Sequence, residues 1–399
     1  MSFNYLFDTW EKSNQSVKLN LNYRKIFPYY QQSNLNNIKV DFSTNDYLSL
    51  RNDKRITDEG YRSALNFGAG SGCSRMVTQT DPGIEILESN FSNRTGYNHS
   101  LFFPTGFTAN ISLFDGLSPF SWEENSFDQH VFIDHRCHSS LFYGVKNSNI
   151  KFDQFKHSEY DHLIFKLNSS SAKVKIIIVE SLYSMDGDYS DPHRLLEVCQ
   201  KFGAMLIIDE THSVGTFSIK GSWSLAYSFL KPYILASVFG CGKAIGVSGG
   251  FISTDYFQLK ERILQKARPL IYSTAVSPFL TGAVNKSLNI IFSEEGKEKR
   301  KKLINNIEYF KKNILLLKDK NLEFDFNKFN FHNHHSNIFP LVFKDNKNIM
   351  EKESFFLEKG LLLKAIRPPS IPKGTSRFRV ILRSGHTKED LDFLFSYLN

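Results

Sequence analysis

The chain has 399 residues, of which 41% are hydrophobic and 23% are charged, and its formal net charge is +8 at pH 7. These values are typical of a soluble globular protein with more than one domain. The mild positive charge fits a solvated basic surface, or the steering of an anionic substrate such as an acyl-CoA or an acidic carrier protein. No dense basic stripe interleaved with aromatic residues occurs, so we do not expect nucleic-acid binding.

The four cysteines show no CxxC spacing, which argues against a zinc knuckle or a redox pair and fits a reducing compartment. No apolar run approaches the roughly 20 residues that span a bilayer, and the first residues lack the pattern of a signal peptide. We therefore expect a cytoplasmic enzyme without a membrane partner. His332, His334 and His335 lie in an Asn-rich stretch with no acid among them, so we predict a polar loop and no metal site.

Taken in chain order, residues 1–40 predict a short helix followed by an arm. Residues 41–285 alternate short apolar runs with helical stretches, which predicts a large α/β domain whose mostly parallel central sheet is covered by helices. Residues 286–399 predict a smaller C-terminal α/β domain. Within these domains we predict strands at 101–103, 131–133, 174–179 and 205–208, and helices beginning near residue 106 and spanning 192–202, 294–317 and 388–398.

The strongest chemical signal surrounds Lys243, which stands in a Gly/Ser-rich stretch. Asp209 directly follows the apolar run 205–208, and His212 comes three residues later. A lysine can bind an aldehyde covalently, a carboxylate can keep a pyridine nitrogen protonated, and small residues leave room for a ring and a phosphate. The pattern therefore predicts a pyridoxal phosphate (PLP) site at the carboxyl ends of the strands, where ligands bind in such sheets.

Other residues have weaker signals taken singly. Gly106 and Phe107 open a helix after a strand, and a helix N-terminus can hold a phosphate, although many such helices bind nothing. His138 is placed to stack on the ring and Ser184 to reach its phenolic oxygen, but a His or Ser near a strand end is more often structural. Arg377 and Arg379 share one face of a predicted strand, where guanidinium groups suit a carboxylate and a solvated face is the alternative.

Two other functions remain open at this point. Gly246-Val-Ser248-Gly-Gly250 fits the G-x-S-x-G string of a serine hydrolase, which would use Ser248 with His386. Small residues precede this string where a strand is required, which argues against that alternative. A non-catalytic partner subunit is the third interpretation, and the presence of Lys243 argues against it.

Eight segments distributed in order over residues 43–369 resemble the α-oxoamine synthase family of fold-type I PLP enzymes. Each motif is weak alone, whereas the ordered set is specific. The segments are Ser43-Thr-Asn45-Asp-Tyr47-Leu, Gly68-Ala-Gly70-Ser-Gly72-Cys-Ser74-Arg75, Thr105-Gly106-Phe107-Thr-Ala-Asn110, Ser184-Met-Asp186-Gly-Asp188, Asp209-Glu-Thr-His212-Ser-Val-Gly, Gly242-Lys243-Ala-Ile-Gly, Tyr272-Ser273-Thr274 and Ala365-Ile-Arg367-Pro-Pro.

The resemblance implies the decarboxylative condensation of an amino acid with an acyl thioester. It is strongest to the members that make 8-amino-7-oxononanoate for biotin biosynthesis from L-alanine and pimeloyl-CoA or a pimeloyl-carrier protein. Relatives with the same catalytic core include glycine C-acetyltransferases and synthases of aminoketones or α-hydroxyketones, so the amino acid and the acyl donor stay open.

The resemblance also implies a role for individual residues. Lys243 binds the cofactor and moves protons, and Asp209 pairs with the pyridine nitrogen. His212 and Ser184 contact the phenolic oxygen, and His138 stacks on the ring.

Further residues follow from the same resemblance. Gly106 and Phe107 provide N–H groups for the phosphate. Ser273 and Thr274 reach the phosphate of a neighbouring subunit, which implies a homodimer with shared active sites. The resemblance implies that Asn45 and Arg379 bind the amino-acid carboxylate. It also implies that Arg367 and Arg24 contact the acyl thioester.

Three positions depart from the family pattern. Gly240 replaces a Thr or Ser that contacts phosphate, Thr211 replaces an Ala, and Ile84 replaces a common His. None of these changes removes a catalytic group. We expect Gly240 to weaken cofactor binding unless Ser237 compensates.

Overall fold

The computed structural model describes residues 2–19, 37–78, 81–120, 128–218, 220–317, 325, 334–343, 346–368 and 370–398. Arg24, predicted to face the acyl thioester, and His332 of the histidine-rich stretch lie outside these residues.

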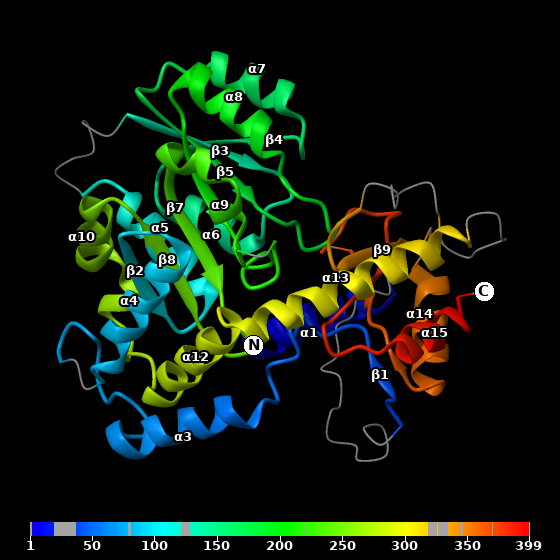
Figure 1. Cartoon of the computed structure of the whole chain (residues 1–399). Coiled ribbons are helices and arrows are strands. Elements are labelled where there is room, and N and C mark those ends of the chain that lie inside the picture. Colours follow the sequence, from blue (N-terminus) through cyan, green and yellow to red (C-terminus); the bar gives the residue numbers. More distant parts are fainter. Residues whose placement is uncertain are drawn as a thin grey trace.

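A seven-stranded sheet forms the centre of the larger part of the molecule, with the strand order β2-β8-β7-β6-β5-β3-β4 (Figure 1). The β3–β4, β3–β5, β5–β6 and β6–β7 pairs are parallel, and β8 runs antiparallel to both β2 and β7. The predicted mostly parallel sheet is thereby confirmed. The strands are β2 (His99–Phe103), β3 (Gln129–Asp134), β4 (Lys151–Phe155), β5 (Val174–Glu180), β6 (Met205–Asp209), β7 (Ile234–Gly240) and β8 (Gly250–Thr254).

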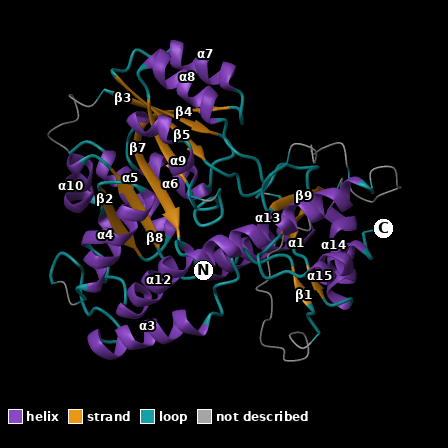
Figure 2. Ribbon diagram, in the orientation of Figure 1, coloured by secondary structure: helices purple, strands orange, loops and turns teal. Residues whose placement is uncertain are grey.

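Helices cover both faces of this sheet (Figure 2), which explains why an inner strand such as β6 is a continuous apolar run, whereas the edge strand β4 is polar. In β6, Leu206 and Ile208 belong to one core and Ile207 to the other, because successive side chains of a strand point to opposite faces. The core containing Ile207 is completed by α5 (Gly106–Leu117), α6 (Ser139–Asn147), α10 (Phe257–Lys266) and α11 (Arg268–Ile271). The core containing Leu206 is completed by α4 (Gly83–Thr95), α7 (Tyr160–Asn168), α8 (Pro192–Phe202), η1 (Ser228–Tyr233), α9 (Trp223–Ala226) and α12 (Pro278–Ile291).

The C-terminal part has its own small sheets, and the long helix α13 runs from α12 of the larger part into the C-terminal part (Figure 1). An antiparallel three-stranded sheet has the order β11-β12-β9, and β1 pairs in parallel with β10. Val40 and Asp41 of β1 are thus paired with a strand of the C-terminal part. The elements are β1 (Val40–Asp41), α13 (Glu294–Leu315), β9 (Ile338–Val342), α14 (Asn346–Glu358), β10 (Leu361–Leu362), β11 (Ala365–Ile366), β12 (Arg377–Ile381) and α15 (Lys388–Phe395).

Several predicted boundaries agree with the structure. The helix predicted at 192–202 is α8, and Gly203 ends it in the left-handed conformation with φ of 59°. The helices predicted at 294–317 and 388–398 are present but end at Leu315 and Phe395. The remaining helices are α1 (Ser2–Leu19) and α3 (Lys54–Phe67). In the described part of the chain, no helix is both long enough and apolar enough to cross a bilayer.

The start of α5 packs directly on β8 at a glycine. A Cβ at Gly250 would lie 2.7 Å from the Cα and from the N of Gly106. Both are backbone atoms, so no side-chain rotation can relieve the contact. The close approach brings the N-terminus of α5 to the carboxyl end of β7.

We predict that Gly250→Ala lowers the free energy of unfolding by about 1–3 kcal/mol, because an overpacked backbone contact must open. Gly70→Ala is the control, since a Cβ there meets no atom within 4 Å. Urea denaturation of both variants measures the difference. Equal stability of the two variants would contradict the proposed packing of α5 on β8.

Candidate active site

A cavity of about 230 Å³ lies beyond the carboxyl ends of β6 and β7, at the N-terminus of α5. Its walls come from five separate segments of the chain. It brings together six of the residues predicted to bind a cofactor: Gly106, Phe107, His138, Asp209, His212 and Lys243. Asn110, Ser140, Glu180, Thr211 and Ser248 also line it.

The Asp209 carboxylate, at the end of β6, is held on both oxygens. Oδ1 accepts the backbone N–H of Thr211 at 2.9 Å, and Oδ2 accepts Nδ2–H of Asn110 at 3.1 Å. The same Asn110 amide donates to Ser140 Oγ at 2.9 Å, and Ser140 Oγ lies 2.7 Å from His138 Nδ1. A buried carboxylate with fixed partners is stable enough to hold a cationic ring nitrogen in place.

Glu180 stands beside Asp209 in the β5–β6 register. It accepts the backbone N–H of His138 at 2.5 Å. Burial, followed by repulsion from Asp209, raises the pKa of Glu180 well above its usual value. The rise favours the uncharged form of Glu180 beside Asp209.

A chain of polar contacts leads from His212 into the C-terminal part. The Tyr47 hydroxyl lies 2.6 Å from His212 Nδ1 and 3.3 Å from Asn45 Oδ1, and Asn45 Oδ1 accepts Nη2–H of Arg379 at 3.0 Å. Burial raises the pKa of Tyr47. Burial also lowers the pKa of His212, and the positive charges of Lys243 and Arg379 lower it further. Asn45 Oδ1 can only accept, so the Tyr47 hydroxyl donates to it and acts as an acceptor toward His212 Nδ1.

The Lys243 amine is largely buried at the cavity wall. Burial, and then the positive charge of Arg379, lowers the pKa of Lys243. A larger neutral fraction makes this amine a better nucleophile and a better proton acceptor near neutral pH. His138, on the same cavity, has a pKa lowered by burial.

Sequence reasoning assigned no role to three residues that hold this site. Asn110 is four residues after Gly106, so the helical repeat puts both on one face of α5. Glu180 ends a predicted strand, as Asp209 does. Tyr47 lies 165 positions from His212, and only the fold brings them together.

Comparison with known proteins agrees with this geometry. The sequence model of the aminotransferase class I and II family matches residues 37–398. The 8-amino-7-oxononanoate synthases of Salmonella arizonae and Salmonella paratyphi A are 31% and 30% identical over 360 residues, which are 90% of this chain and 88% of each relative.

Two solved structures share the fold. The serine palmitoyltransferase of Sphingomonas wittichii has a TM-score of 0.81 at 22% identity, covering 90% of this chain and 86% of the other. An 8-amino-7-oxononanoate synthase of Francisella tularensis has a TM-score of 0.71 at 22% identity, covering 90% and 96%. The chain belongs to the α-oxoamine synthase family, within the class I and II aminotransferases.

The cofactor of this α-oxoamine synthase is therefore PLP, and the cavity fits it. An amine with a lowered pKa, a buried carboxylate and a helix N-terminus stand around one space. The space is kept open by glycines, because Gly106, Gly240, Gly242 and Gly249 contribute no side chain to its wall.

The other predicted residues lie outside the cavity lining. Ser184 presents its carbonyl oxygen to Arg379 Nη1 at 2.9 Å. Ser273 and Thr274 are exposed and line a separate small hollow. Arg367 follows β11 and is partly exposed.

The structure does not support the serine hydrolase alternative. Ser248 lines the cavity, but both ring nitrogens of His386 contact other groups. Nδ1 accepts the backbone N–H of Arg383 at 3.2 Å, and Nε2 lies 3.0 Å from the carbonyl oxygen of Asp41. Ser248 therefore has no histidine base in His386.

The suggestion that Ser237 compensates for Gly240 is wrong. The Ser237 side chain is fully buried and does not line the cavity. Its Oγ lies 2.6 Å from the Tyr97 hydroxyl. Ser237 points to the opposite face of β7 because its strand position differs from that of Gly240 by an odd number.

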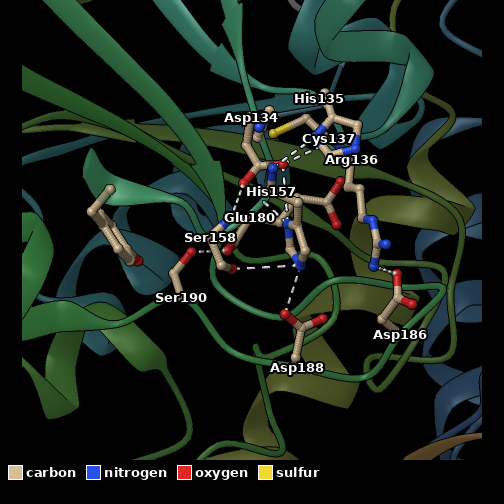
Figure 3. Close-up of polar contacts among 12 residues, drawn as sticks. Asp134, His135, Arg136, Cys137, His157, Ser158, Glu180, Asp186, Asp188 and Ser190 are labelled. Carbon is tan, nitrogen blue, oxygen red and sulfur yellow. Dashed lines mark hydrogen bonds and ion pairs between the residues drawn. The ribbon is translucent and has the colours of Figure 1, made fainter. Parts of the chain in front are cut away.

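The loop 184–188 is fixed by arginines from two directions. Arg377 Nη1 donates to the carbonyl of Met185 at 3.1 Å and to Asp186 Oδ1 at 2.7 Å. Arg136 forms an ion pair with the other oxygen of Asp186 at 2.6 Å (Figure 3). The Arg377 guanidinium group is therefore occupied by contacts with this loop. Arg379 is the β12 arginine that contacts Asn45.

His157 holds the far end of the same loop between two carboxylates (Figure 3). Nδ1 lies 3.1 Å from both oxygens of Asp134, and Nε2 lies 2.7 Å from Asp188 Oδ2. Burial opposes protonation, but the hydrogen bonds to Asp134 and Asp188 prevail and raise the pKa of His157 to about 9. The imidazolium thus ties the loop carrying Ser184 to the end of β3.

We predict that His157→Gln destabilises the protein most at low pH. A pKa raised from 6.5 to about 9 corresponds to about 3 kcal/mol of stabilisation. Because the folded-state pKa is the higher one, this contribution is complete below pH 6.5 and is lost as pH rises through 9.

Urea denaturation at pH 6, 7.5 and 9.5 measures this difference, with His193→Gln at an exposed histidine as the control. The stability gap between wild type and His157→Gln should close as pH rises. A gap that stays constant with pH would show that His157 is not held as a cation.

Proposed function

We propose that the protein condenses L-alanine with a pimeloyl thioester, carried by CoA or a carrier protein, and releases CO₂, the free thiol carrier and 8-amino-7-oxononanoate. The observation that carries the proposal is the 31% identity to the Salmonella arizonae 8-amino-7-oxononanoate synthase over 90% of this chain and 88% of that protein. This product belongs to biotin biosynthesis.

The carboxylate of the amino acid is assigned to Arg379 with Asn45. The guanidinium group is buried, its Nη groups hold Ser184 and Asn45, and its Nε–H has no partner among the described residues. A buried N–H without a partner is rare, and a guanidinium group is suited to bind a carboxylate.

The proton at the α-carbon is assigned to Lys243. Its lowered pKa suits removal and return of a proton near neutral pH. PLP, when bound, supplies a conjugated ring that accepts the electron pair left on the amino acid. Asp209 supports this role because its carboxylate is positioned to keep the ring nitrogen protonated, and neutral His212 lines the same cavity.

We predict that the purified protein forms a product with the mass of 8-amino-7-oxononanoate from L-alanine and pimeloyl-CoA or a pimeloyl-carrier protein. Glycine and L-serine, each with acetyl-CoA and palmitoyl-CoA, complete the panel, read by mass spectrometry. Lys243→Ala is the control and should lower turnover by at least about 10³-fold, since it removes the reacting amine.

The panel separates the members of the family. A product from glycine with acetyl-CoA, and none from alanine, would replace the proposed reaction with that of a glycine C-acetyltransferase. Normal turnover by Lys243→Ala would overturn the mechanism itself.

We further propose a homodimer in which Ser273 and Thr274 reach the phosphate bound by a second copy of this chain. Two facts support it: both residues are exposed on the segment after α11, and neither lines the cavity of its own chain.

Thr274→Val with Ser273→Ala should weaken PLP binding by about 10-fold or more, through lost hydrogen bonds to a charged group. PLP titration of the apo protein measures the affinity, and light scattering measures the mass. A monomer with unchanged PLP affinity would contradict the shared site.

A further inference from the structure

Thr211 stands at the end of the cavity where the helix α5 begins. It shares the cavity wall with Gly106 and Phe107, the first two residues of α5. The N–H groups at these positions have no acceptor within the helix, and the helix dipole makes this end attractive to an anion. This is the end of the cavity that suits a phosphate.

The Thr211 hydroxyl is oriented by one hydrogen bond. Its Oγ1 accepts the backbone N–H of Gly240 at 2.8 Å. A hydroxyl that accepts a hydrogen bond keeps its own proton for donation. Within the described part of the chain that proton has no acceptor, so the hydroxyl can donate into the cavity.

The Thr211 side chain also fills the space beside Gly240. A Cβ built at position 240 would lie 2.7 Å from Thr211 Cγ2 and 2.9 Å from Thr211 Oγ1. A Cβ at Gly106 would be 4.0 Å from the same hydroxyl. A side chain at 240 therefore forces the Thr211 side chain out of its present position.

We infer that Thr211 Oγ–H is a ligand of the cofactor phosphate, and that it takes the place of a hydroxyl at position 240. Gly240 and Thr211 are then one coupled change and not two independent ones. The inference depends on PLP and on the position of Thr211, and it is independent of which acyl thioester the enzyme uses.

The decisive comparison is between PLP and pyridoxal, which lacks the phosphate. We expect Thr211→Val to weaken PLP binding to the apo protein by about 10-fold to 100-fold, the range for a lost hydrogen bond to a charged group. Pyridoxal binding should change by less than about threefold, because no phosphate contact is lost. Thr211→Ser keeps the hydroxyl and should retain the wild-type affinity for PLP.

The affinities are measured by titrating apo protein with each aldehyde and following the absorption band. Equal weakening of PLP and pyridoxal by Thr211→Val would indicate a structural role and overturn the inference, as would an unchanged affinity for PLP. Ser237→Ala is the matched control, since Ser237 is a buried hydroxyl of β7, the strand of Gly240, and does not line the cavity.

An exchange of the two positions provides a second test. Gly240→Thr alone should weaken PLP binding, because the new side chain collides with Thr211. The double variant Thr211→Ala/Gly240→Thr should bind PLP at least about 10-fold more tightly than Gly240→Thr, because the collision is removed and a hydroxyl is restored.

Thermal denaturation of each apo variant confirms that it is folded before titration. Additive effects of the two substitutions would overturn the coupling. If the wild-type enzyme proves to use another amino acid or thioester, the PLP titrations still decide the role of Thr211.

Discussion

The site depends on one buried negative charge, the carboxylate of Asp209 at the end of β6. A charge in this position is tolerated only where hydrogen bonds replace its water. Asn110 from α5 and the backbone of Thr211 provide them, while the raised pKa of Glu180 favours its uncharged form beside Asp209. The position of the Asp209 carboxylate, proposed to face the cofactor nitrogen, therefore depends on how α5, β5 and β6 are packed together.

The loop 184–188 connects this charge to the C-terminal part of the chain. Arg377 and Arg379 of β12 reach its carbonyl groups, and His157 and Arg136 hold it from the side of the large sheet. Because Arg379 also contacts Asn45, the group proposed to bind the substrate carboxylate is positioned by the same contacts that position Ser184. A shift of the C-terminal part would therefore change both sites together.

The coupling that we propose between Thr211 and Gly240 would let a departure from a family pattern keep its chemistry. Read along the chain, Gly240 is a lost hydroxyl and Thr211 is an unrelated replacement. In the structure the two residues touch, and the Thr211 hydroxyl accepts the backbone N–H of Gly240. Ser237, which is nearer to Gly240 in sequence, is directed away from the cavity because side chains alternate along β7.

The mostly parallel sheet, several helix boundaries and the group formed by Lys243, Asp209 and His212 could all be predicted from the sequence. These features depend on local information: apolar runs of strand length, capping glycines, and the carboxyl ends of strands, which meet at one edge in a parallel sheet. Tertiary structure decided the contacts of Tyr47 with His212, of Arg379 with Asn45, and of Thr211 with Gly240. Those contacts join segments that are far apart in the chain, and their distances are set by how the helices and sheets pack, which no short stretch of sequence specifies.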